Sequence, residues 1–220
     1  MPLNLQRPII YLITSGETTY QTTAASKEFI RLLKLVEAAV VARVSLLQLR
    51  EKNLTTRVLY DLAIKAAAIT RDSSTRLLVN DRADVASAAE ADGVHLTTQS
   101  IETSVVRQTF GDQFLIGASA HSLPEVHKAF AGKADFAVFG PVFDTPSKGT
   151  YGSAQGLTKL AQVTAEVKPF PVLALGGVTL DKVADCFRAG ASGIAGIRLL
   201  NEAKELPRVV KEIGMRFGLQ

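Results

Sequence analysis

The feature that most constrains the fold is a regular alternation of short apolar runs with longer amphipathic segments. Gly, Pro, Asp or Ser bounds each apolar run, as is usual for strands. The runs are apolar almost throughout, which is typical of strands buried on both faces of a parallel sheet. The predicted strands are Ile9–Thr14, Ser45–Arg50, Arg76–Asn80, Gly93–Leu96, Phe114–Ser119, Phe136–Gly140, Phe170–Gly177 and Gly193–Ile197.

Helical periodicity fills the intervals between these strands. Ser26–Ala42 begins with a capping serine and places Phe29, Leu32, Leu33 and Val36 at helical spacing. The other segments with clear helix signals are Leu54–Asp72, Ser122–Phe130, whose Glu125 suits a capping box, and Thr179–Ala191.

Strict alternation of strands and helices predicts an α/β fold, a (β/α)8 TIM barrel. A doubly wound open sheet is the competing fold, because alternation alone does not close a barrel. The count of eight strands and the length of 220 residues favour the barrel. With 47% hydrophobic residues and no linker or change of composition, we expect a single domain over residues 1–220.

Composition narrows the possible partners and the location. The net charge of +4 is spread along the chain without a basic stripe, so we expect no nucleic-acid partner. A weakly positive field suits a small anionic substrate, although ordinary surface charge is the more common explanation. No apolar run reaches the ~18 residues of a membrane span, and the N-terminal segment lacks the pattern of an export signal. Cys186 is the only cysteine, which favours the reducing cytoplasm.

In such barrels the active site lies at the carboxyl ends of the strands. Polar residues follow most of the predicted strands and are expected to meet at one mouth. They are Gln48, Arg50, Glu51, Lys52, Asn80, Asp81, Arg82, Thr97, Thr98, Gln99, Ser100, Ser119, His121, Thr145, Ser147, Lys148 and Arg198.

Gly176–Gly177 ends the seventh strand just before a predicted helix capped by Thr179. Small residues there allow backbone N–H groups to approach an anion, and barrels commonly hold phosphate near strands 7 and 8. Arg198 could then pair with that phosphate. The alternative for the two glycines is an ordinary tight turn.

Other polar residues also have structural explanations. Arg50–Glu51–Lys52 could be a solvated charge cluster, and Asp81 could cap the next helix. We expect His95 to pack in the core rather than face the barrel interior. His127 is expected on a helix surface, and Cys186 in the core.

Several motifs together resemble the thiamin phosphate synthase superfamily, which includes the TenI-like thiazole tautomerases. They occur in the order QLREK (48–52), VNDRADVA (79–86), ADGVHL (91–96), IGASAHS (116–122), ADFAVFGPVFDTPSK (134–148) and PVLALGGVTLDKV (171–183). The synthases join a pyrimidine pyrophosphate to a thiazole phosphate and release pyrophosphate.

This resemblance implies a role for each matching residue. The pyrimidine pyrophosphate would be held by Gln48, Arg50, Lys52, Asn80, Ser119 and Lys148. The thiazole phosphate would be held by Thr145, Ser147 and Gly177, with Ile197 and Arg198 beside it. Asp81 would bind Mg²⁺, which with Arg and Lys neutralises the leaving pyrophosphate.

The sequence departs from the synthase pattern after the fourth strand. It reads GVHLTTQS where synthases usually read GVHLGQxD, so Ser100 stands in place of the second magnesium ligand. A hydroxyl is a poor substitute for a carboxylate. Arg198 also replaces the small serine that is usual after the eighth strand.

These departures rank the possible functions. We expect a TenI-like tautomerase first, with His121 moving a proton and no cofactor. A synthase with a weakened Mg²⁺ site is the alternative, and a non-catalytic phosphate-binding protein is a third. In each case the partner is a small phosphorylated molecule. The oligomeric state stays open, with a homodimer among the options.

Overall fold

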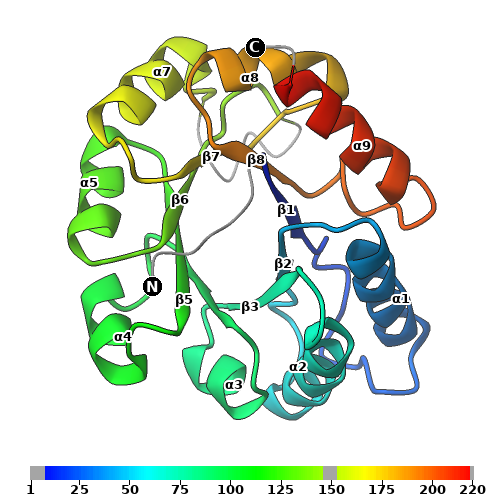
Figure 1. Cartoon of the computed structure of the whole chain (residues 1–220). Coiled ribbons are helices and arrows are strands. Elements are labelled where there is room, and N and C mark those ends of the chain that lie inside the picture. The colour runs from blue at the N-terminus through cyan, green and yellow to red at the C-terminus, as the bar shows by residue number, and fades with distance from the viewer. Residues whose placement is uncertain (1–7, 146–152, 219–220) are drawn as a thin grey trace.

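The computed structural model describes residues 8–145 and 153–218, and it shows a closed parallel barrel in which β1 pairs with both β2 and β8. Figure 1 shows the helices surrounding the ring of strands. The strands are β1 (Ile9–Ile13), β2 (Leu46–Leu49), β3 (Arg76–Asn80), β4 (Gly93–Leu96), β5 (Leu115–Ala120), β6 (Phe136–Phe139), β7 (Val172–Ala174) and β8 (Gly193–Gly196). The predicted barrel is therefore confirmed, and the open sheet is excluded.

The helices follow the strands in sequence and cover the outside of the barrel (Figure 1). They are α1 (Lys27–Val41), α2 (Thr56–Thr70), α3 (Ala83–Ala88), α4 (Thr103–Phe110), α5 (Leu123–Ala131), α7 (Gly156–Glu166), α8 (Val183–Arg188) and α9 (Leu206–Phe217), with a 3₁₀ turn η1 (Leu180–Lys182).

Apolar residues form two cores, one on each face of the strands. The larger lies between strands and helices, where Phe29, Leu32 and Val36 of α1 are buried as predicted. The smaller fills the barrel interior and includes Tyr11 and Phe136. Because both faces of each strand are covered, the strand sequences are apolar almost throughout.

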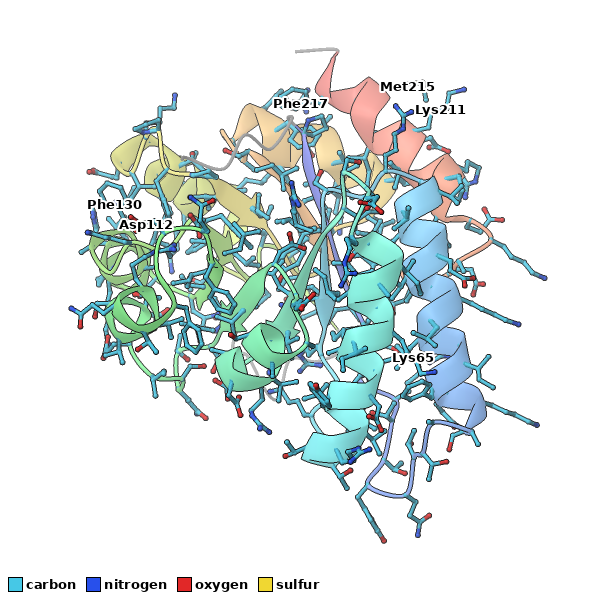
Figure 2. The ribbon with its side chains drawn as sticks, turned by 60° about the horizontal axis from the view of Figure 1, so that its bottom comes forward. Lys65, Asp112, Phe130, Lys211, Met215 and Phe217 are labelled. Carbon is cyan, nitrogen blue, oxygen red and sulfur yellow. The ribbon has the colours of Figure 1, made fainter. Side chains whose placement is uncertain are left out.

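The helices present polar and charged side chains outward. Figure 2 shows Lys65 on α2 and Lys211 on α9 projecting from the helix layer, with Met215 beside Lys211. Phe217 instead packs inward on Phe187, with ring centroids 5.0 Å apart. Within the described residues, no helix has the length and apolar character needed to cross a membrane.

Side chains cap two helix starts, and one of them, Ser122, belongs to the predicted capping box. The Thr55 side chain accepts a hydrogen bond from the Val58 N–H, and the Ser122 side chain accepts one from Glu125. The Glu125 carboxylate accepts from the His121 N–H, one residue earlier than in a regular capping box. Ser26 does not cap α1, because its Oγ accepts from the Thr23 N–H instead.

Glu51 ties the β1–α1 loop to the end of β2. Its side chain is only 3% exposed. The carboxylate accepts hydrogen bonds from the hydroxyls of Thr14 at 2.6 Å and Thr18 at 2.7 Å, and from the Gly16 N–H at 3.2 Å. The solvated-cluster interpretation of Arg50–Glu51–Lys52 is thus wrong for Glu51, since burying a carboxylate requires such partners.

Glu51→Ala is expected to lower the free energy of unfolding by about 1–3 kcal/mol, because several buried donors lose their acceptor. Chemical denaturation measures this change. Glu37→Ala, on the exposed face of α1, is the matched control and should change stability little. Equal effects of the two substitutions would contradict this role of Glu51.

Candidate active site

The carboxyl ends of the strands bring most predicted site residues to one mouth of the barrel. Gln48, Asn80 and Ser119 lie near the ends of β2, β3 and β5, and their side chains point inward. Arg50 and Asp81 follow β2 and β3 directly. Ser147 and Lys148 lie outside the described residues, so the structure does not place them.

Two hydrogen-bonded pairs, each with a buried aromatic member, lie beneath this mouth. The Gln48 amide donates to the Tyr11 hydroxyl at 2.6 Å, and His95 Nε2 lies 2.9 Å from Ser119 Oγ. Phe136 contacts the aromatic member of each pair, with its ring centroid 5.4 Å from that of Tyr11 and 6.1 Å from that of His95. The prediction that His95 packs in the core rather than facing the barrel interior is wrong, because its side chain lies on the inward face of β4.

The aromatic members of these pairs are electrically neutral. Burial, and then the positive charge of Arg50, lower the pKa of His95 to about 3. Burial raises the pKa of the Tyr11 phenol well above its ordinary value, against the smaller opposing effect of the Gln48 hydrogen bond. The interior therefore orients Gln48 and Ser119 through neutral hydrogen bonds.

Arg50 is held at the mouth by the end of β1. Its backbone N–H donates to Thr14 Oγ1 at 2.8 Å, and Thr14 in turn donates to Glu51. Its side chain is half-buried beside Gly16, whereas Lys52 is exposed. Arg50 can supply positive charge inside the mouth, and Lys52 can supply it from the rim.

The predicted magnesium position holds one carboxylate. Asp81 is exposed, has a φ of 61° that Asp tolerates better than most residues, and donates its N–H to the His95 carbonyl at 2.9 Å. Ser100 Oγ accepts from the Thr97 N–H at 2.7 Å, closing a local turn. Within residues 8–145 and 153–218, no cluster of three His, Cys, Asp or Glu residues could hold a metal. Asp81 alone would need substrate oxygens to complete a Mg²⁺ shell.

Gly176 and Gly177 are required by a close contact with the loop after β6. Their φ values are 93° and 63°. A Cβ on Gly177 would lie 2.4 Å from the Asp144 carbonyl oxygen, and one on Gly176 would lie 2.5 Å from Pro141 Cα. The positive φ values and this close contact account for both glycines without any bound phosphate.

The predicted helix cap after these glycines is wrong. Thr179 precedes the 3₁₀ turn η1, its side chain caps no N–H, and α8 begins only at Val183. A phosphate site here cannot rest on a helix N-terminus. Such a site would rest on the Gly177 backbone and the side chains nearby.

Those side chains come from two neighbouring loops. Arg198, after β8, donates from Nη2 to Thr145 Oγ1 of the β6 loop at 3.3 Å. Ile197 packs against the interior core. Gly177 lies under Asp144, the residue before Thr145. The described residues predicted to hold the thiazole phosphate are therefore neighbours.

His121 lies at the start of α5. Its Nδ1 bonds to the Gly140 carbonyl, which places the ring proton on Nδ1 and makes Nε2 the basic nitrogen. The ring lines a cavity of about 180 Å³ together with Phe139 and with Gln155 and Lys159 near the start of α7. This cavity lies on the outer face of β6, since Phe139 belongs to the core between strands and helices.

Tyr11 and Asn201 support the mouth but were not singled out from the sequence, and Glu51 was expected at the mouth without its structural role. Tyr11 and Glu51 hold Gln48 and the β1 loop as described. Asn201 donates to the carbonyls of Ile13 at 2.7 Å and Ile197 at 2.6 Å, joining the ends of β1 and β8. Nothing in the sequence marks Tyr11 as inward-facing, Glu51 as buried or Asn201 as a link between two strand ends.

A closed (β/α)8 barrel with polar and cationic residues at the carboxyl ends of its strands is the architecture of a barrel enzyme. A family model described as "Thiamine monophosphate synthase" matches residues 10–200. The chain belongs to this family, which confirms the resemblance and makes it an enzyme of the thiamin phosphate synthase superfamily.

Similar proteins bear the same name. The chain is 44% identical to "Putative thiamine-phosphate synthase" of Geobacter sulfurreducens over 164 residues, which are 74% of this chain and 76% of that protein. It is 35% identical to "Thiamine-phosphate synthase" of Chloroflexus aurantiacus, over 81% and 82% of the two chains. The solved structure of a Pyrococcus furiosus thiamine phosphate pyrophosphorylase has 28% identity and a TM-score of 0.76, covering 96% of this chain and 95% of that one.

Arg198→Ala is expected to weaken binding of inorganic phosphate about tenfold, because one charge-assisted hydrogen bond is lost. Isothermal titration calorimetry measures the dissociation constant. Arg188→Ala, at an exposed arginine on α8, is the control and should bind phosphate like the unaltered protein. Unchanged affinity in Arg198→Ala would remove Arg198 from the phosphate site.

Proposed function

We propose that the protein is a thiamin phosphate synthase. From the sequence, Ser100 favoured a tautomerase, and the synthase was the alternative. The single observation that carries the proposal is the similarity to proteins named thiamine-phosphate synthase across most of the chain. The mouth supports it, because Gln48 and Ser119 are each held by a buried partner at positions where the synthase resemblance needs them.

In this reaction the bond between the pyrimidine methylene carbon and the pyrophosphate oxygen breaks. The thiazole nitrogen forms a new bond to that carbon, and pyrophosphate leaves with the electron pair. The leaving charge must be neutralised, which in our proposal is the role of Arg50, Lys52 and Lys148. Ser119 and Asn80 would donate hydrogen bonds to the same group, and Gln48 would bind the pyrimidine.

The second substrate would bind beside the loops after β6, β7 and β8. Its phosphate would lie between Thr145, Arg198 and the Gly177 backbone, with Ser147 completing the site. Ile197 would provide an apolar contact for the thiazole. Mg²⁺ supplies charge neutralisation when bound, and Asp81 with pyrophosphate oxygens is the donor set that fits it.

The direct test is formation of thiamin phosphate from the pyrimidine pyrophosphate, the thiazole phosphate and Mg²⁺, followed by chromatography. Ser100→Asp is expected to raise the rate severalfold at low Mg²⁺ concentration, because a second carboxylate adds a ligand. Its side chain can still accept the Thr97 N–H, so the turn should be preserved.

Ser100→Asn is the matched control, since asparagine has the shape of aspartate without its charge. It should leave the Mg²⁺ dependence of the rate unchanged. A lack of thiamin phosphate in both the native protein and Ser100→Asp would disprove the synthase proposal.

A tautomerase remains a second candidate because of two observations. Ser100 takes the place of the metal-binding carboxylate, and the Gly140 carbonyl fixes the His121 tautomer that makes Nε2 a base. The cavity beside His121 lies on the outer face of β6. The side chains of Gln48, Asn80 and Ser119 point to the inward side instead, so the synthase is the first choice.

His121→Ala separates the two reactions. If the protein isomerises a thiazole carboxylate phosphate, the substitution should slow that reaction about 10²–10⁴-fold, the usual loss for a general acid–base. Thiamin phosphate formation should fall much less. The exposed His127→Ala serves as control, and an unchanged isomerisation rate in His121→Ala would remove His121 from the mechanism.

A further inference from the structure

In the pair formed by His95 and Ser119, the two ring nitrogens of His95 are not equally hydrogen-bonded. His95 is only 3% exposed, and its Nε2 lies 2.9 Å from Ser119 Oγ. Its other nitrogen, Nδ1, is buried and has no hydrogen-bond partner in the part of the chain that the structure describes. The two nitrogens therefore differ completely in their surroundings.

The space around Nδ1 is closed by apolar groups. A Cβ built on Gly117 would lie 2.6 Å from Nδ1 and 2.4 Å from Phe136 Cζ, so not even a methyl group fits there. A buried N–H without an acceptor is rarer in proteins than a buried lone pair without a donor. The neutral ring thus carries its single proton on Nε2 and leaves Nδ1 bare.

This tautomer sets the direction of the hydrogen bond. His95 Nε2–H donates, and Ser119 Oγ accepts. Ser119 is half-buried at the end of β5, and its own proton must then point away from the ring. An inward-facing residue at the end of a barrel strand has the mouth on that side. Its hydroxyl is therefore set to donate to an acceptor such as a phosphate oxygen.

We propose that His95 is a positioning residue that fixes the Ser119 hydroxyl as a hydrogen-bond donor toward a pyrophosphate group in the mouth. The identity of the anion rests on the proposed synthase function, whereas the direction of the hydrogen bond rests on the buried ring alone. His95 itself touches no substrate in this arrangement. Its effect passes entirely through Ser119.

The first measurement needs no substrate. Two-bond ¹H–¹⁵N correlation spectra of the protein labelled with ¹⁵N-histidine distinguish the two neutral tautomers of a ring. His95→Gln assigns the His95 signals, because they disappear in that variant. We expect a protonated Nε2 and a bare Nδ1. A protonated Nδ1 would overturn the proposal, because Ser119 would then be the donor to His95.

The second measurement is the affinity for inorganic pyrophosphate in the presence of Mg²⁺, by calorimetry. His95→Leu removes the donor at similar volume and should weaken binding about tenfold, as should Ser119→Ala. The double variant should be no weaker than the weaker single variant, because both remove one interaction. His95→Gln keeps an amide N–H near the Nε2 position and should restore much of the affinity.

His127→Leu, on the exposed face of α5, is the matched control and should bind pyrophosphate like the unaltered protein. Thermal unfolding of each variant shows whether it is folded, and His95→Gln provides the comparison if His95→Leu is not. Additive losses in the double variant, or full affinity in folded His95→Leu, would overturn the proposal. Absence of pyrophosphate binding in the native protein would overturn it too.

Failure of the proposed synthase function can be distinguished from failure of the positioning role of His95. If the native protein makes no thiamin phosphate, but pyrophosphate binding still depends on His95 through Ser119, the synthase reaction is excluded. The positioning role of His95 then stands for whatever pyrophosphate compound the mouth binds.

Discussion

Every strand of the barrel is covered on both faces, so any polar side chain that points inward must find its partner inside the ring. Few such partners fit in a space already filled by Ile, Leu and Phe side chains. The result is a small number of fixed pairs, Gln48 with Tyr11 and Ser119 with His95. These pairs determine what the mouth can present to a substrate before any substrate arrives.

The same constraint explains why the fold could be predicted from the sequence and parts of the site could not. Burial on both faces can be recognised in the sequence, since β1 and β2 are apolar at nearly every position. It also erases the alternation that would tell inward from outward. His95 could therefore be recognised as a strand residue but not assigned to a face, which depends on register with β3 and β5.

Among the residues after the strands, some were placed correctly from the sequence and others were not. Arg50 and Asp81 follow strands directly and Arg198 lies two residues after β8, so their position at the mouth required only the fold. Glu51 is equally charged and adjacent, yet it is buried, because the β1 loop provides donors that no local pattern shows. Ser100 favours a tautomerase but is a single position, whereas similarity along most of the chain favours the synthase.

The loops after β6, β7 and β8 are interlocked at one side of the mouth. The Asp144 carbonyl rests on Gly177, and Thr145 is bonded to Arg198. The loop after β6 therefore contacts both of the other loops, through Asp144 on one side and Thr145 on the other. A larger residue at Gly177 would displace the backbone at Asp144, next to the threonine that bonds Arg198, so a substitution in one loop reaches residues of the other two.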